Sequence, residues 1–448
     1  MPDFTGMALQ ELLRPEGFDC ACGRHHQAGL RHARIGKGAL EALNGYLRAL
    51  HITRPFVFCD ENTHLAAGAR VAKILQASGI PHTLYILPSG HPEPDEMACG
   101  GLLMAVDPRC DGVLAVGSGV INDTGKVLAH ALRLPLMCVA TAPSMDGYAS
   151  DSSSMVRRGV KVSLYNACPQ ALIADTDILA NAPMRLLQAG LGDMLAKYCS
   201  ICEWRIANLV IGEYYCEDIA ALMRQALKRV RAAAPRLKER DAVAVEEITQ
   251  GLVLSGIAMA FAGVSRPASG LEHYFSHIWE MMALSRGLPV ELHGIQVGIG
   301  TLLTINIWGK LKHQIPSRKT AQAFIDGLDE AAWEDRVRRV FGQAAETILK
   351  TARAEGRNDK AAHAKRLQVS LGEWPQIQKI AQEELPAYQE VRGLMESLQM
   401  PLAPGDIGFT REDTVDALMG AREIRDKYLT SSLLWDLGLL YTKAPEWL

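Results

Sequence analysis

The sequence predicts an α/β domain with a parallel sheet, followed by a mainly α-helical domain. In the first part of the chain, short apolar runs alternate with segments of helical spacing, a pattern typical of parallel strands joined by right-handed helical crossovers. Beyond Pro183 almost every segment has helical spacing. We therefore expect a nucleotide-binding domain over residues 1–180, a helical domain over residues 181–448, and chemistry in the cleft between them.

The first predicted strand is the apolar run 55–59, which ends at Asp60. Asn62 and Thr63 can cap the helix that follows, which continues through Ala77 and stops at Gly79. The same reasoning predicts a helix over residues 121–132 and further strands at 82–87, 112–116, 135–140, 160–165 and 171–174. Residues 310–366 are charged and helical in pattern, which favours a solvated surface or packing between subunits.

Composition excludes several classes of protein. A formal charge of −3 over 448 residues gives no reason to expect nucleic-acid binding. The N-terminus lacks the charge order and apolar run of a secretory signal, and the longest apolar stretch, 252–264, is too short to predict a membrane span. Ten cysteines in a chain of this length suit reduced thiols. We expect a cytoplasmic protein.

Two glycines suggest a nucleotide site. A strand that turns into a helix through Gly117-Ser-Gly119 lets an anion approach the backbone, and the helix N-terminus offers unpaired N–H groups. The next loop, 141–150, is rich in hydroxyls and carries Asp146 directly after a buried strand. These features favour binding of a nucleotide pyrophosphate at the carboxyl ends of the strands. A tight connection and an ordinary polar loop remain the alternatives.

Asp193, His273, His277 and His293 predict a divalent-metal site. His273 and His277 are four residues apart in a helical pattern, so both rings project from one face. His293 follows a Gly-Leu-Pro turn that can return the chain over that face. Zinc and nickel accept imidazole nitrogen and carboxylate oxygen together. The alternative is four unrelated polar residues on separate helices.

A second cysteine- and histidine-rich segment lies near the N-terminus. Cys20, Cys22, His25 and His26 resemble half of a metal site, but no second pair follows at the usual spacing. We therefore interpret the segment as a structural turn. Cys199 and Cys202 lie in a helical pattern and favour packing over redox chemistry.

Taken together, these motifs resemble the sn-glycerol-1-phosphate dehydrogenases, a branch of the iron-containing alcohol dehydrogenase and glycerol dehydrogenase superfamily that includes dehydroquinate synthase more distantly. The resemblance rests on the glycine turn with Asn122, Asp123 and Lys126, and on the segments 141–147, 192–197, 265–277 and 292–294. Within the superfamily, segment 265–270 is similar to the phosphate-using branch, and the N-terminal Cys-x-Cys-Gly to the bacterial form.

The resemblance implies a role for each matched position. Asp193, His273 and His293 match metal ligands, while Asp146, Asp193 and His277 match residues that contact substrate. Catalysis is expected from Asp193 and from His277 as proton relay or substrate-orienting residue. The positions expected to contact NAD or NADP are Asp60, Asn62, Gly117, Gly119, Val120, Ile121, Asn122, Asp123, Thr141, Ala142, Pro143, Ser144 and Ser150.

Two departures from the family pattern affect this transfer. The turn reads Gly-Ser-Gly where many members have three glycines. Lys197 occupies the position where iron-dependent relatives carry a further histidine, which favours zinc or nickel. Arg266 and Lys197 are the expected partners of a substrate phosphate, although a salt bridge would explain either residue.

The implied activity is reduction of a phosphorylated triose, dihydroxyacetone phosphate, by a cytoplasmic homodimer. A polyol dehydrogenase acting on an unphosphorylated substrate and a lyase or cyclase similar to dehydroquinate synthase remain alternatives. The sequence does not choose between zinc and nickel, or between NAD and NADP, and it does not determine the product enantiomer or the oligomeric state.

Overall fold

A computed structural model describes residues 3–88, 92–158 and 160–448. The chain divides into two compact units, Met1–Met194 with Cys216–Ser265, and Leu195–Tyr215 with Arg266–Leu448. Helices α10 (Glu217–Ala233) and α11 (Ala242–Ala262) therefore group with the first unit although they follow residue 180. The expected functional boundary near residue 180 stays a prediction.

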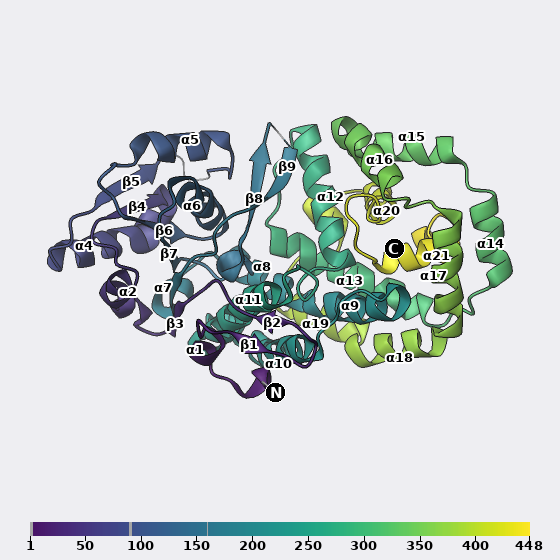
Figure 1. Ribbon diagram of the computed structural model, residues 1–448, viewed down its shortest axis with the longest axis horizontal. Coiled ribbons are helices and arrows are strands. Elements are labelled where there is room, and N and C mark those ends of the chain that lie inside the picture. The colour runs from purple at the N-terminus through teal and green to yellow at the C-terminus, as the bar shows by residue number, and fades with distance from the viewer. Residues whose placement is uncertain (1–2, 89–91, 159) are drawn as a thin grey trace. The chain divides into compact units, whose positions relative to one another are not determined.

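The first unit is built on a parallel sheet in the order β3-β10-β7-β6-β4-β5 (Figure 1). The strands are β3 (His32–Gly36), β4 (Pro55–Asp60), β5 (Thr83–Leu87), β6 (Gly112–Gly117), β7 (Leu136–Ala140) and β10 (Ala171–Asp175). The central strands β4, β6, β7 and β10 are completely buried, as expected where helices cover both faces of a parallel sheet. The predicted α/β class is confirmed.

Helices pack on each face of this sheet. On one face Val57, Leu114 and Val139 join a core with η2 (Ala39–Ala42), α2 (Leu43–Ala49) and α4 (Ala69–Ala77). On the other face lies α6 (Gly119–Leu132), where a Cβ at Gly125 would be 3.1 Å from the Cβ of Ala115. α5 (Glu96–Ala105) follows β5 in the chain.

All of the predicted strands are found, within one or two residues at their ends, but the sequence pattern missed four others: β3, β8 (Ser152–Arg157) and the two-residue strands β1 (Phe18–Asp19) and β2 (His25–His26). β3 forms one edge of the sheet, and β8 pairs antiparallel with β9 (Val160–Tyr165). The predicted caps of the helix after β4 need a correction. Asp60 is the N-cap, because its carboxylate accepts from the Thr63 amide at 2.7 Å, and three short segments follow it: α3 (Glu61–Thr63), η3 (His64–Gly68) and α4.

The remaining elements of the first unit surround the sheet and its loops. They are η1 (Phe4–Gly6), α1 (Leu9–Leu12), β1 (Phe18–Asp19), β2 (His25–His26), η4 (Gly147–Ala149), α7 (Thr176–Leu179), α8 (Met184–Leu195) and η5 (Ala234–Glu239). α11 extends beyond the apolar stretch seen in the sequence. This helix is long and apolar enough to cross a membrane. However, 67% of its most apolar 18-residue segment is buried inside the structure, as in the core helix of a globular protein.

The second unit is helical throughout its described residues, which confirms the predicted helical class. Its core joins Tyr274, Trp279, Trp308 and Trp435 with apolar residues of many helices. The elements are α9 (Lys197–Ile211), α12 (Leu271–Arg286), α13 (His293–Leu311), α14 (Arg318–Asp326), α15 (Glu330–Phe341), η6 (Gly342–Ala344), α16 (Ala345–Ala354), α17 (Lys360–Gly372), α18 (Trp374–Glu384), α19 (Tyr388–Ser397), η7 (Pro404–Ile407), α20 (Arg411–Gly420), α21 (Thr430–Asp436) and η8 (Ala444–Trp447).

Candidate functional site

Three adjacent strands deliver the predicted nucleotide-contacting residues to one edge of the sheet. Asp60 ends β4, Gly117 ends β6, and Thr141 follows β7 directly. Strand register pairs Phe58 with Ala115 and Gly117 with Ala140, so these ends lie at one level. In open parallel sheets this edge is where ligands bind.

The N-terminus of α6 has amides suited to an anion. Ser118 is its N-cap and makes no capping hydrogen bond with its side chain, so Gly119, Val120 and Ile121 point amides outward without a side-chain acceptor from the cap. The glycine at 117 has a packing role as well, because a Cβ there would lie 2.5 Å from the Ile121 side chain. The backbone therefore approaches its own helix closely at this turn.

The loop after β7 is held against this turn. The hydroxyls of Ser118 and Ser144 are 2.6 Å apart, and the Tyr148 hydroxyl donates to the Ala142 carbonyl at 2.8 Å. A Cβ at Gly190 of α8 would lie 1.8 Å from the Pro143 carbonyl oxygen, so that helix and the loop are in direct contact. The predicted residues 141–144 are consequently fixed by the polypeptide itself.

Other predicted cofactor residues also contact the protein. The amide of Asn122 donates to the Gly147 carbonyl at 3.3 Å, and Asp123 accepts from the Ser154 amide at 3.0 Å. Burial raises the pKa of the Asp123 carboxyl against the opposing effect of Lys126. The buried Lys126 ammonium donates to the Gly147 and Ser152 carbonyls and to the Ser150 hydroxyl. Asn62 is exposed at the start of α3.

Asp193 is fully buried on α8 and lies beside the loop that contains Asp146. Its Oδ2 accepts from the Asp146 backbone amide at 3.0 Å, while the Asp146 carboxylate accepts from the Ser255 hydroxyl of α11 at 2.8 Å. Both predicted carboxylates thus belong to one hydrogen-bonded group in the first unit. A carboxylate oriented by hydrogen bonds in this way is suited to bind a metal.

The three predicted histidines converge in the second unit. His273 and His277 lie on α12 and His293 begins α13. Ring centroids are 5.2 Å apart for His273 and His293 and 5.8 Å apart for His277 and His293. The three rings therefore lie close together, and their role as metal ligands or substrate contacts stays a prediction. Asp193 belongs to the first unit, so its relation to them stays a prediction.

Neighbouring side chains orient two of the rings. His273 Nδ1 is 2.9 Å from Glu272 Oε1, and His293 Nδ1 is 3.0 Å from the Ser276 hydroxyl and 3.3 Å from Glu280 Oε1. When Nδ1 is engaged with a carboxylate, the Nε2 lone pair is directed to a metal. The donor set therefore fits a divalent ion of the zinc or nickel type.

Glu272 and Glu280 were missed by the sequence reasoning. Glu280 lies close enough to His277 and His293 for one ligand atom of each of the three residues to fall within 4.8 Å of the others. The spacing offered a signal, since Glu272 directly precedes His273 and Glu280 is one helical turn beyond His277. Carboxylates next to histidines that bind metal commonly orient them.

The two expected phosphate partners are both buried. Arg266 forms a bidentate ion pair with Glu213, with Nε 2.6 Å from Oε1, and donates to the Tyr428 carbonyl at 3.0 Å. Its Nη1 is buried and has no hydrogen-bond partner among the described residues. Lys197 donates to the Ala268 carbonyl at 3.2 Å.

A third cation near this segment was missed. Lys427 donates to the Ser269 carbonyl at 3.2 Å. Burial, then the charges of Arg266 and Arg425, lower the pKa of the Lys427 ammonium to about 7. Several cations thus surround residues 266–269, an arrangement that an anion would stabilise. No local motif near residue 427 signalled this, because the contact depends on the fold.

The chain is similar in sequence to iron-containing alcohol dehydrogenases and to glycerol-1-phosphate dehydrogenases. The family model for iron-containing alcohol dehydrogenases matches residues 34–183. Glycerol-1-phosphate dehydrogenase (NAD(P)+) of Halalkalibacterium halodurans is 34% identical over 64% of this chain and 72% of its own length. The Bacillus licheniformis protein of the same name is 32% identical over 71% of this chain and 82% of its own length. The Methanosarcina mazei protein of that name is 34% identical over 62% of this chain and 77% of its own length.

Solved structures support the fold. Glycerol dehydrogenase from Schizosaccharomyces pombe superposes with a TM-score of 0.58 at 15% identity, covering 95% of this chain and 92% of its own. Maleylacetate reductase from Rhizobium sp. superposes with a TM-score of 0.56 at 13% identity, covering 93% of this chain and 96% of its own. At these identities the likeness concerns the architecture alone.

Proposed function

This chain belongs to the glycerol-1-phosphate dehydrogenase family, and from that membership we propose that it reversibly reduces dihydroxyacetone phosphate to sn-glycerol 1-phosphate with NAD(P)H and a bound divalent metal. The identity to relatives of that name carries the proposal. The histidine arrangement supports it, because the ring centroids of His273 and His293 lie 5.2 Å apart and each ring has its Nδ1 held by a neighbouring side chain.

Asp193, His273 and His293 would hold the metal. One carboxylate oxygen and two imidazole nitrogens leave coordination positions open for substrate, as in catalytic zinc sites. Lys197 in place of a further histidine favours zinc or nickel over iron. When bound, the metal polarises the ketone carbonyl and the nicotinamide provides the hydride.

The protein side chains then bind substrate and move the proton. His277, whose ring stacks against that of His293, is the proposed proton donor to the alkoxide oxygen. Glu280 is positioned to orient His277, since Oε2 lies 3.9 Å from its Nδ1. Asp146 accepts a hydrogen bond from a substrate hydroxyl while Ser255 fixes its carboxylate.

The nucleotide binds at the carboxyl ends of β4, β6 and β7 in this proposal. The amides of Gly119, Val120 and Ile121 receive the pyrophosphate, and Asp60 faces the ribose hydroxyls. The loop 141–144 and Ser150 border the nicotinamide half, while Asn122 donates to the Gly147 carbonyl and Asp123 accepts from the Ser154 amide of β8. We expect a cytoplasmic homodimer without nucleic-acid or membrane partners.

The substrate phosphate is assigned to the cations around residues 266–269. Lys197 and Lys427 present ammonium groups to the carbonyls of Ala268 and Ser269, and Arg266 has one unused nitrogen there. A phosphate would pair these cations with a negative charge, which a neutral backbone carbonyl does not supply.

Substrate discrimination tests this assignment. In Arg266→Ala the KM for dihydroxyacetone phosphate should rise at least tenfold more than the KM for dihydroxyacetone, about 1.4 kcal/mol of differential binding. Glu213→Gln is the matched control, because it breaks the Arg266 ion pair and keeps the guanidinium. If Arg266→Ala raised the KM for both substrates equally, and Glu213→Gln had the same effect, the Arg266–Glu213 ion pair would only support the fold.

A further inference from the structure

Four metal-ligand side chains meet in the first unit, well separated in sequence from the proposed catalytic ligands. They are Cys20, Cys22 and His26 of the N-terminal segment and Cys216, the N-cap of α10. One ligand atom of each lies within 4.8 Å of all the others. The sequence could not reveal the fourth member, since it stands 196 residues from Cys20.

The distances match a tetrahedral zinc site. Cys20 Sγ is 3.6 Å from Cys216 Sγ, and His26 Nε2 is 3.3 Å from Cys22 Sγ and 3.7 Å from Cys216 Sγ. With zinc about 2.3 Å from sulfur and about 2.0 Å from nitrogen, tetrahedral ligands are roughly 3.5–3.8 Å apart. The observed separations therefore need little adjustment.

The histidine is already oriented as a ligand. His26 Nδ1 is 2.7 Å from the Phe261 carbonyl oxygen, which only accepts hydrogen bonds. Nδ1 therefore carries the proton, and Nε2 presents its lone pair to the three sulfurs. A backbone carbonyl in this position is a common outer partner of a metal-bound imidazole.

The backbone around the cysteines favours a small ligand loop. The Gly23 amide donates to the Cys20 carbonyl at 3.0 Å, and Gly23 adopts φ of 82°, a conformation that favours glycine. The turn places Cys20 and Cys22 on the same side as His26 in the β1–β2 hairpin. The interpretation as a purely structural turn without metal does not explain why Cys216 completes the set.

We propose that Cys20, Cys22, His26 and Cys216 bind one zinc ion in a closed, structural site. The three thiols lose their protons to solvent on binding, and the Cys20 thiol gives up its contact with Asp218 Oδ2, 3.1 Å away. Asp218 stays in the first turn of α10, where a carboxylate is favourable. The site is independent of the catalytic metal and does not rest on the proposed function.

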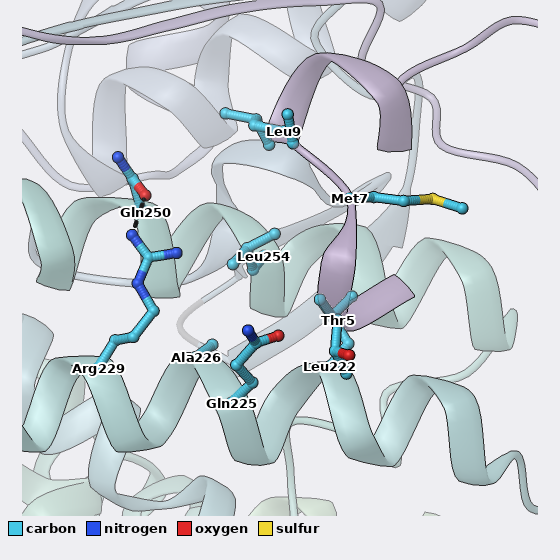
Figure 2. Close-up of a pocket in the computed structure, with 10 residues that line it drawn as sticks. Thr5, Met7, Leu9, Leu222, Gln225, Ala226, Arg229, Gln250 and Leu254 are labelled. Atoms are coloured by element: carbon cyan, nitrogen blue, oxygen red, sulfur yellow. Dashed lines mark hydrogen bonds between the residues drawn. The ribbon is translucent and has the colours of Figure 1, made fainter. Parts of the chain in front are cut away.

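The site would cross-link the N-terminal segment to α10. In the same unit, residues Thr5, Met7, Ala8 and Leu9 form a pocket of about 280 Å³ with Leu222, Gln225, Ala226 and Arg229 of α10 and with Gln250 and Leu254 of α11 (Figure 2). The segment is thus incompletely packed there. Phe4 and Phe18 contact Phe261 nearby, so apolar contacts and zinc would hold the segment together.

Metal analysis and X-ray absorption at the zinc edge test the site in protein purified in reductant and then supplied with zinc alone. In the His273→Ala/His293→Ala variant, which lacks two of the proposed catalytic ligands, the expected result is one zinc with three sulfur and one nitrogen neighbours. In that background the zinc should persist with Cys99→Ser and be lost with Cys22→Ser or Cys216→Ser. Loss should also speed tryptic cleavage after Arg24, in the turn that carries the ligands.

Two results would overturn the proposal. One is an absorption spectrum without sulfur neighbours after zinc has been supplied, which needs no variant to fold. The other is a Cys20–Cys216 disulfide found by mass spectrometry of the non-reduced protein, because those thiols would then be unavailable to a metal.

Discussion

At the residue scale, the buried cations near residues 266–269 differ in their charged neighbours. Arg266 is satisfied largely by Glu213, whereas Lys427 sits beside other cations and its ammonium has a pKa lowered to about 7. A dianionic phosphate would stabilise the ammonium, so Lys427 is the cation whose protonation is most sensitive to substrate.

Lys427 gives a pH prediction. The ammonium predominates at pH 6 and is lost as pH rises through a pKa of about 7, so the KM for dihydroxyacetone phosphate should increase above pH 7. Lys427→Met should raise that KM about tenfold or more at pH 6 and flatten its pH dependence, as measured by steady-state kinetics.

Lys443→Met, at an exposed position, is the control and should keep the wild-type profile. A Lys427→Met variant that retained both the wild-type KM and its rise above pH 7 would show that another group titrates there.

The site residues that sequence could predict were those with local spacing. His273 and His277 stand one turn apart, and His293 follows a turn, so their convergence was foreseeable. Cys216 and Lys427 were not, because each meets its partners across long stretches of chain. Glu272 is adjacent to His273 in the sequence, but only the fold showed that its carboxylate contacts the His273 ring.

At the element scale, the sequence pattern predicted the central strands, the edge strand β5 and the hairpin strand β9, but it missed β3 at the other edge and β8 in the hairpin. β3 reads His-Ala-Arg-Ile-Gly and β8 reads Ser-Ser-Ser-Met-Val-Arg, so neither contains a continuous apolar run. Edge strands and hairpins are only partly buried, and their polar faces hide the pattern. The central strands are buried on both faces, which explains why their sequences were clear.

The contact between α8 and the loop after β7 gives a second prediction. Gly190→Ala would place a Cβ 1.8 Å from the Pro143 carbonyl oxygen, so helix or loop must shift. We expect the free energy of unfolding to fall by about 1–3 kcal/mol and NAD(P)H binding to weaken, measured by chemical denaturation and fluorescence titration.

Gly100→Ala, on α5, has no neighbour within 4 Å of the added Cβ. That variant should bind the cofactor normally and be unchanged or more stable by about 0.5–1 kcal/mol. Wild-type stability and affinity in Gly190→Ala would contradict the close contact.

At the scale of the whole molecule, the two proposed metal sites differ in their ligands. The proposed structural zinc is enclosed by three sulfurs and one nitrogen, whereas the proposed catalytic ligands, Asp193, His273 and His293, offer one oxygen and two nitrogens and leave room for substrate. Chelation strong enough to remove both ions would confuse a loss of fold with a loss of catalysis. Mild removal of the catalytic metal avoids this, provided that the sulfur-coordinated zinc is shown to be still bound afterwards.

The most direct measurement is oxidation of NADH and NADPH with dihydroxyacetone phosphate, using protein depleted of the catalytic metal and restored separately with zinc and nickel. The account predicts metal-dependent oxidation that yields sn-glycerol 1-phosphate, and none in Asp193→Asn. Absence of oxidation with either metal and either cofactor, in folded wild-type protein, would contradict it.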